Sequence, residues 1–256
     1  MLGWSINLCR IRGITLALHV SFLALLAYVA WEGWTEGGLA GAAWSVAIIG
    51  TFFTCVVLHE LGHSLTARHF GIGVRRILLM PIGGMAEFES IPREPRRELL
   101  ITLAGPAVNF AIAGLLWSLV GSPRQWSLSS YEADALGFAH LLLHWNLLMG
   151  CFNLVPVFPM DGGRIFRALL ATRLTYVRAT FWAATVGKIL AVVGAVLAVF
   201  WWETYLTAVL FIFIFYAGER EYRALLHREL IAAHAREILA RFDAITPAEP
   251  PVIRPD

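Results

Sequence analysis

Long apolar stretches alternate with short polar segments along most of the chain. Six of them have or approach the length, roughly 20 residues, that a helix needs to cross ~30 Å of hydrocarbon. They cover residues 14–31, 39–67, 99–120, 135–159, 179–200 and 205–216. We therefore predict an all-α integral membrane protein with six transmembrane helices.

Two parts of this pattern are irregular. The fourth stretch contains Pro156 and Pro159, which remove backbone donors, so we expect a broken fourth span. The connection between the second and third stretches is long, yet residues 77–86 in its middle are uncharged and mostly apolar. We expect this loop to be partly re-entrant or β-like, and a loop lying on the lipid headgroups is the alternative.

The pattern changes after the sixth stretch. Residues 218–243 place apolar side chains at helical spacing between charges, which predicts a cytoplasmic amphipathic helix. Residues 244–256 are rich in proline, and we expect a disordered tail. We therefore divide the chain into a membrane core over 1–217, the helix over 218–243 and the tail.

Composition supports the membrane class, because 58% of the 256 residues are hydrophobic and only 15% are charged. Eighteen of the nineteen arginines lie in the amino-terminal segment, the loops after the second and fourth stretches, and the carboxyl-terminal part. Loops rich in arginine stay in the cytoplasm, so we expect a multi-pass protein of the cell (inner) membrane with both termini cytoplasmic. This membrane topology explains where the arginines lie along the chain, so they do not indicate a nucleic-acid partner.

The second stretch contains the pattern His-Glu-x-x-His at residues 59–63. His59 and His63 lie one helical turn apart, so both imidazoles can reach one Zn²⁺, and Glu60 can take a proton from a metal-bound water. A packed pair of core histidines is the alternative. Ionisable groups at membrane depth cost several kcal/mol unless they bind something, which favours the metal.

A catalytic zinc needs a third protein ligand. Asp161 is the aspartate that adjoins the cytoplasmic end of a stretch, at a depth similar to that of His63. We interpret Glu87, Glu89 and Glu98 as solvated charges paired with arginines of their loop. The sequence therefore predicts Asp161 as the third ligand.

Taken together, these residues resemble the site-2 proteases, a family of intramembrane zinc metalloproteases. Besides residues 59–63, the resemblance rests on Gly83-Gly-Met-Ala86, on Leu103-Ala-Gly-Pro-Ala-Val-Asn109, and on residues 146–164 with Asn153-Leu-Val-Pro-Val-Phe-Pro-Met-Asp161-Gly-Gly-Arg164. It implies that His59, His63 and Asp161 bind zinc, that Glu60 is the general base, and that Asn153 helps to hold the scissile peptide. Met160 replaces the usual leucine, which conserves volume.

The family implies cleavage of transmembrane segments in regulated intramembrane proteolysis. The expected partners are a single-span membrane protein substrate and the lipid bilayer, and an extended edge in the loop over 77–86 could pair with an unwound substrate by β-augmentation. The resemblance is to a short form without a PDZ domain or a nucleotide-binding regulatory module, so we expect regulation to come from elsewhere.

Two other functions fit part of the pattern. A cytoplasm-facing membrane zinc protease of another family would lack the proline-rich segment before Asp161. A metal-transport protein would need polar residues continuing across the bilayer, where the sequence offers His140 and His144, which we interpret as packing residues. These motifs do not specify the substrate or the cleavage position. They also leave open whether the protein forms a homo-oligomer.

Overall fold

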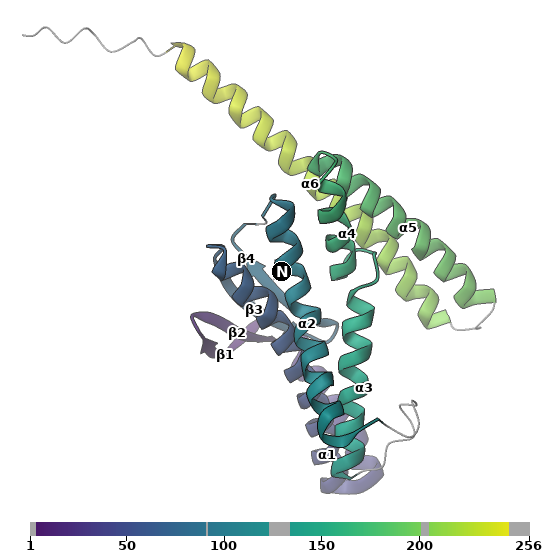
Figure 1. Ribbon diagram of the computed structural model, residues 1–256. Coiled ribbons are helices and arrows are strands. Elements are labelled where there is room, and N and C mark those ends of the chain that lie inside the picture. The colour runs from purple at the N-terminus through teal and green to yellow at the C-terminus, as the bar shows by residue number, and fades with distance from the viewer. Residues whose placement is uncertain (1–3, 91, 123–133, 201–204, 246–256) are drawn as a thin grey trace, which may run out of the picture.

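The structure is a computed structural model that describes residues 4–90, 92–122, 134–200 and 205–245 (Figure 1). In chain order the elements are β1 Ser5–Ile11, β2 Ile14–His19, α1 Val20–His69, β3 Val74–Met80, β4 Gly83–Phe88, α2 Pro95–Val120, α3 Ala135–Asn153, α4 Asp161–Ala171, α5 Tyr176–Phe200 and α6 Tyr205–Ile245. Most of the predicted tail, residues 246–256, lies outside the described part.

The prediction of an all-α protein is confirmed only in part, because four strands of the described residues form a sheet in the order β1-β2-β3-β4. Strand β2 pairs antiparallel with β1 and parallel with β3, and β3 pairs antiparallel with β4. The apolar residues within 14–19 belong to strand β2, inside this sheet, and not to a helix. The first helix therefore begins at Val20, capped by the His19 side chain. The expected β-like loop is confirmed as the β3–β4 hairpin.

Helix α1 contains two of the predicted stretches. At about 1.5 Å per residue its 50 residues would extend roughly 75 Å if straight, more than twice the apolar thickness of a bilayer. Gly37 and Gly38 have non-helical dihedral angles, and the rings of Phe22 and Phe53 pack with centroids 4.5 Å apart. The chain therefore folds back at the two glycines, and the second arm of α1 carries the His-Glu-x-x-His segment.

Among the described residues, four helices, α1, α2, α3 and α5, are long and apolar enough to cross a membrane. The fourth predicted stretch ends as a helix at Asn153, and residues 154–160 are irregular before α4 begins, as the prolines predict. Residues 205–216 form the start of α6, which continues without a break to Ile245. The described part of the chain is thus that of a mostly helical membrane protein with one small sheet.

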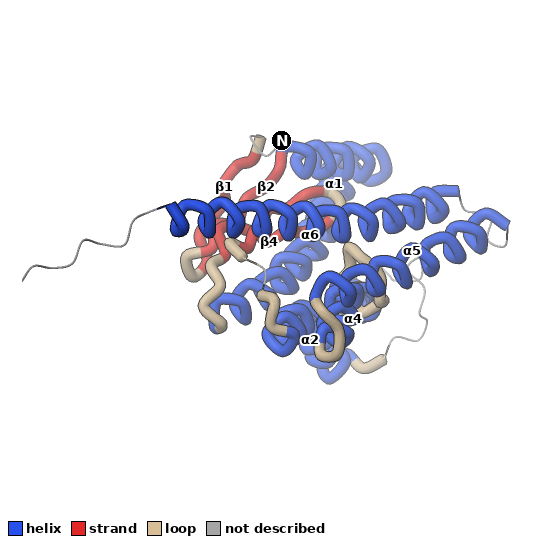
Figure 2. Tube along the Cα trace, turned by 90° about the horizontal axis from the view of Figure 1, so that it is seen from above, coloured by secondary structure: helices blue, strands red, loops and turns tan. Residues whose placement is uncertain are grey.

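The elements form two groups (Figures 1 and 2). The second arm of α1 packs on α2 and the sheet, while α3 and α4 pack on α2. Helices α5 and α6 lie side by side, joined by the ion pair Lys188–Glu219, and they contact α4 and the 154–160 segment. In addition, Glu229 of α6 pairs with Arg93 in the segment before α2. The junction of α1, α2 and α4 contains the three predicted metal ligands, His59, His63 and Asp161.

Candidate metal centre

Three side chains from distant parts of the chain meet at this junction. The Nε2 atoms of His59 and His63 are 3.1 Å apart. The Oδ2 atom of Asp161 lies 3.2 Å from the first and 3.1 Å from the second. All three residues are buried, and they form a group able to hold a metal ion.

The geometry of this triangle fits zinc. Tetrahedral coordination with bonds of ~2.0–2.1 Å requires ligand atoms roughly 3.3 Å apart. The observed separations of 3.1 to 3.2 Å are close to that value. Two imidazoles and one carboxylate are also a usual donor set for a catalytic zinc, which leaves one position open.

Helix α2 orients both histidines. Asn109 Oδ1 lies 2.6 Å from His59 Nδ1, and the Ile101 carbonyl oxygen lies 2.8 Å from His63 Nδ1. Both oxygens accept, so each Nδ1 carries the proton and each Nε2 keeps its lone pair for a metal. Neither partner was predicted from the sequence, although Asn109 ends the Leu103–Asn109 motif.

Gly105 of the same helix explains why the histidines fit. A Cβ atom built at Gly105 would lie 2.2 Å from His63 Nε2 and 2.8 Å from His59 Nε2. Any larger residue would therefore occupy the space of the ligand atoms. The signal for this role was a glycine within an apolar helix, followed directly by Pro106.

The two predicted catalytic residues lie on neighbouring elements. Glu60 is half-buried, and its side chain faces β4: a Cβ atom built at Gly84 would lie 2.7 Å from Glu60 Cγ. Asn153 is the last residue of α3, eight positions before Asp161, and its Nδ2 donates to the Met149 carbonyl at 3.1 Å. Asn153 is outside the three-residue metal group.

Comparisons with known proteins identify the family of this chain. The model of Peptidase family M50 matches residues 47–123 and 125–200, which include all five predicted site residues. The chain belongs to Peptidase family M50. The resemblance to site-2 proteases is thereby confirmed.

Relatives of this M50 chain include a zinc metalloprotease of Methanocaldococcus jannaschii, 36% identical over 222 residues, which are 87% of this chain and 62% of that protein. Rip3 of Mycobacterium tuberculosis is 32% identical over 204 residues, 74% of this chain and 50% of Rip3. The chain thus spans about half to three fifths of the length of these relatives. The solved site-2 protease from Methanocaldococcus jannaschii superposes with a TM-score of 0.59 at 34% identity, covering 86% of this chain and 95% of that structure.

One acidic residue of this M50 chain differs from expectation. Glu87 and Glu89 pair with Arg76 and Arg75 on the sheet, as predicted for charges of an arginine-rich loop. The interpretation of Glu98 as a solvated charge was wrong, because it is 0% exposed. It lies in the first turn of α2, where it binds Arg167 of α4, a partner far away in the sequence.

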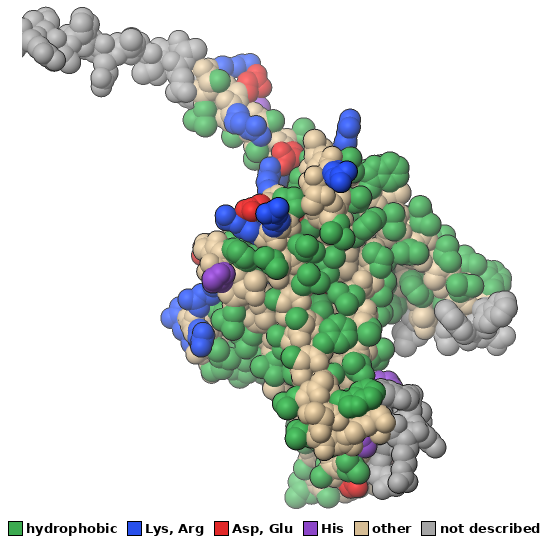
Figure 3. Space-filling model, in the orientation of Figure 1, with side chains coloured by type: hydrophobic (Ala, Val, Ile, Leu, Met, Phe, Trp, Pro, Cys, Tyr) green, Lys and Arg blue, Asp and Glu red, His purple; other side chains and the backbone are tan. Residues whose placement is uncertain are grey.

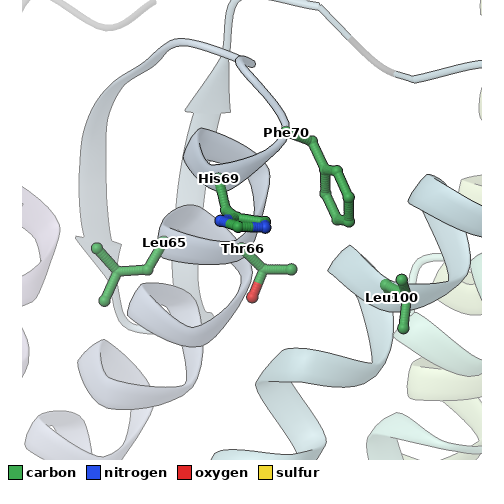
Figure 4. Close-up of a pocket in the computed structure, with 5 residues that line it drawn as sticks. All are labelled: Leu65, Thr66, His69, Phe70 and Leu100. Carbon is green, nitrogen blue, oxygen red and sulfur yellow. The ribbon is translucent and has the colours of Figure 1, made fainter.

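One hollow in this M50 structure lies apart from the metal site. A shallow depression of about 480 Å³ lies between the end of α1 and the start of α2 (Figure 4). Its lining is Leu65, Thr66, His69, Phe70 and Leu100, which includes no carboxylate and none of the predicted site residues. We assign it no catalytic role.

Proposed function

We propose that this chain is an intramembrane zinc metalloprotease that cleaves the transmembrane segment of membrane-anchored proteins. The observation that carries the proposal is the buried triangle of His59, His63 and Asp161 among helices apolar enough to cross a bilayer, with Glu60 next to His59 in the chain. The likeness to a site-2 protease structure, 95% of which is covered, supports it.

The proposed arrangement in the membrane has six spans. They are the two arms of α1, then α2, α3, α5 and the first part of α6, with both termini in the cytoplasm. On the face seen in Figure 3, lysines and arginines gather near α4, the sheet and the outer part of α6, whereas the opposite end is mainly apolar. This asymmetry is what the preference of basic residues for the cytoplasm predicts.

The proposed chemistry divides among the residues of the site. Bound zinc would supply Lewis-acid activation of the scissile carbonyl and of the attacking water. A Glu60 carboxylate oxygen accepts the proton of that water and passes it to the leaving amine nitrogen. The half-buried Asn153 amide holds the substrate peptide beside the site.

Strand β4 offers a way to present the substrate. Within the sheet it pairs with β3 on one side, so its other edge can accept an extended segment by β-augmentation. A hollow of about 220 Å³ lies between this strand, the 158–159 segment and helices α4 and α6. Because Gly84 of β4 lies against Glu60, a segment paired with this edge would pass near the general base.

The decisive test is Glu60→Gln. Glutamine keeps the size of the side chain but does not accept the proton, and loss of general-base catalysis costs roughly 10²–10⁴-fold. We expect purified Glu60→Gln protein to retain zinc, measured by atomic absorption, and to lose detectable cleavage of a membrane-spanning substrate in detergent. Wild-type rates in this variant would refute the mechanism, and loss of zinc would make Glu60 a ligand.

The orientation is tested separately. A reporter that functions only outside the cytosol, fused after Asp256, should be silent. The same reporter inserted in the 123–133 connection should be active. Activity at the carboxyl terminus would invert the proposed topology without affecting the proposed chemistry.

A further inference from the structure

Two buried amides lie in a row behind His59. Asn109 Nδ2 donates to Asn146 Oδ1 at 2.9 Å, and Asn146 Nδ2 donates to the Leu142 carbonyl at 2.9 Å. Both asparagines are 0% exposed. Asn109 orients His59, but Asn146 has no role in the chemistry proposed above, and burying a primary amide is costly unless its groups are bonded.

The direction of this chain of hydrogen bonds follows from its far end. A backbone carbonyl only accepts, so the Asn146 atom that faces Leu142 has to be the nitrogen. The Asn146 oxygen therefore faces Asn109 and requires a donor there. Asn109 in turn presents its oxygen to His59 Nδ1, at 2.6 Å.

Rotating the Asn109 amide by half a turn would exchange its oxygen and nitrogen and so reverse both of its hydrogen bonds. The Asn109 oxygen would then face the Asn146 oxygen, in place of the present hydrogen bond of 2.9 Å. Two buried acceptors would lie opposite each other without a donor. The Asn109 nitrogen would donate to His59 Nδ1 and move the imidazole proton to Nε2, the atom that points at the metal site. Asn146 prevents this rotation.

The second histidine shows why the extra amide is needed. His63 Nδ1 donates a hydrogen bond to the Ile101 carbonyl oxygen. A carbonyl only accepts, so this partner by itself keeps the His63 proton on Nδ1. Only for His59 is the orienting group an amide that fits in two ways. Sulfur contacts do not decide between them, since Met149 Sδ lies 3.5 Å from Asn109 Nδ2 and sulfur is a weak acceptor.

We propose that Asn109 and Asn146 act together as positioning residues that hold the His59 proton on Nδ1, and that this arrangement sets the affinity of the site for zinc. The inference rests on the proposed function, because it takes His59 as a zinc ligand. It adds a residue of α3, Asn146, which touches no ligand, to the determinants of metal binding.

The experiment measures zinc affinity by chelator competition on the purified full-length protein in detergent. Asn146→Leu keeps the volume but lets the Asn109 amide rotate. Changes in groups that orient metal ligands typically weaken metal binding by about 10–100-fold, which is the loss we expect. Met149→Leu, on the same helix and in contact with the same amide, is the matched control and should bind zinc as the wild type does.

A rescue separates tautomer selection from packing. In Asn109→Asp combined with Asn146→Leu, both oxygens of residue 109 accept, so rotation no longer matters and zinc affinity should return to near the wild-type value. Asn109→Ala removes the acceptor directly and should also weaken binding, which keeps the test valid if Asn146→Leu protein is too unstable to purify.

The outcomes are distinguishable. Unchanged affinity in either Asn146→Leu or Asn109→Ala would overturn the inference while leaving the proposed function intact. A double variant that binds zinc as weakly as Asn146→Leu would also overturn it, because the loss would then be one of packing. A wild-type protein without zinc would refute the proposed function itself.

Discussion

Glu98 and Arg167 form a buried ion pair that joins α2 to α4. The guanidinium donates to Glu98 Oε1 through both Nε, at 2.9 Å, and Nη2. Helix α2 orients the two histidines through Ile101 and Asn109, and α4 begins with Asp161. The pair therefore links the helix that orients two of the proposed ligands to the helix that supplies the third.

Removing one partner of this pair should be strongly destabilising. Glu98→Leu leaves Arg167 buried and deprived of its main partner, which typically costs about 3–5 kcal/mol. Glu98→Leu with Arg167→Met should recover most of that loss, because the remaining Glu221 carboxylate is 39% exposed and can be solvated. Unfolding in detergent with increasing denaturant measures these differences.

The matched control is the exposed pair on the sheet. Arg75 and Glu89 have side chains that are 73% and 54% exposed, so Arg75→Leu should change stability by less than about 1 kcal/mol. Equal effects of Glu98→Leu and Arg75→Leu would contradict the role assigned to burial.

Gly105→Ala should block the metal site. Its new methyl group would lie 2.2 Å from His63 Nε2, so zinc content should fall strongly. Gly114→Ala, on the same helix with no atom within 4 Å of the new Cβ, should retain full zinc. Metal analysis of the two purified variants makes the comparison, and stoichiometric zinc in Gly105→Ala would show that the ligands lie elsewhere.

Gly84→Ala should impair catalysis without removing the metal. The added Cβ would lie 2.7 Å from Glu60 Cγ and displace the general base. Misplacing a catalytic group by ~1 Å can cost about 10²-fold in rate, so cleavage should fall by that order while zinc stays bound. Met85→Ala, the next residue of β4 with an exposed side chain, is the control. Unchanged cleavage in Gly84→Ala would show that β4 does not position the general base.

The ligand assignment has a direct test. Replacing His63 or Asp161 by alanine should lower bound zinc well below one equivalent, since a three-ligand site loses its geometry. Glu87→Ala and His144→Ala should leave zinc near one equivalent. If Asp161→Ala kept its zinc, the third ligand would have to be another carboxylate.

The sequence alone determined the features that depend on local spacing. The long apolar runs predicted the helices, because crossing a bilayer requires a certain number of residues in a row. The positions of His59 and His63 predicted a shared face, because a helix brings residues four apart together. Pro156 and Pro159 predicted the break before Asp161 for the same local reason.

Only the tertiary structure decided what depends on partners distant in the chain. Residues 14–19 are a strand because they pair with β3, about sixty residues later, and an apolar run by itself fits a helix as well as a buried strand. Glu98 is buried because Arg167 reaches it, and composition around Glu98 gives no sign of that. The roles of Gly105 and Asn146 exist only where α1, α2 and α3 pack together, because each role is a contact between helices and not a property of one segment.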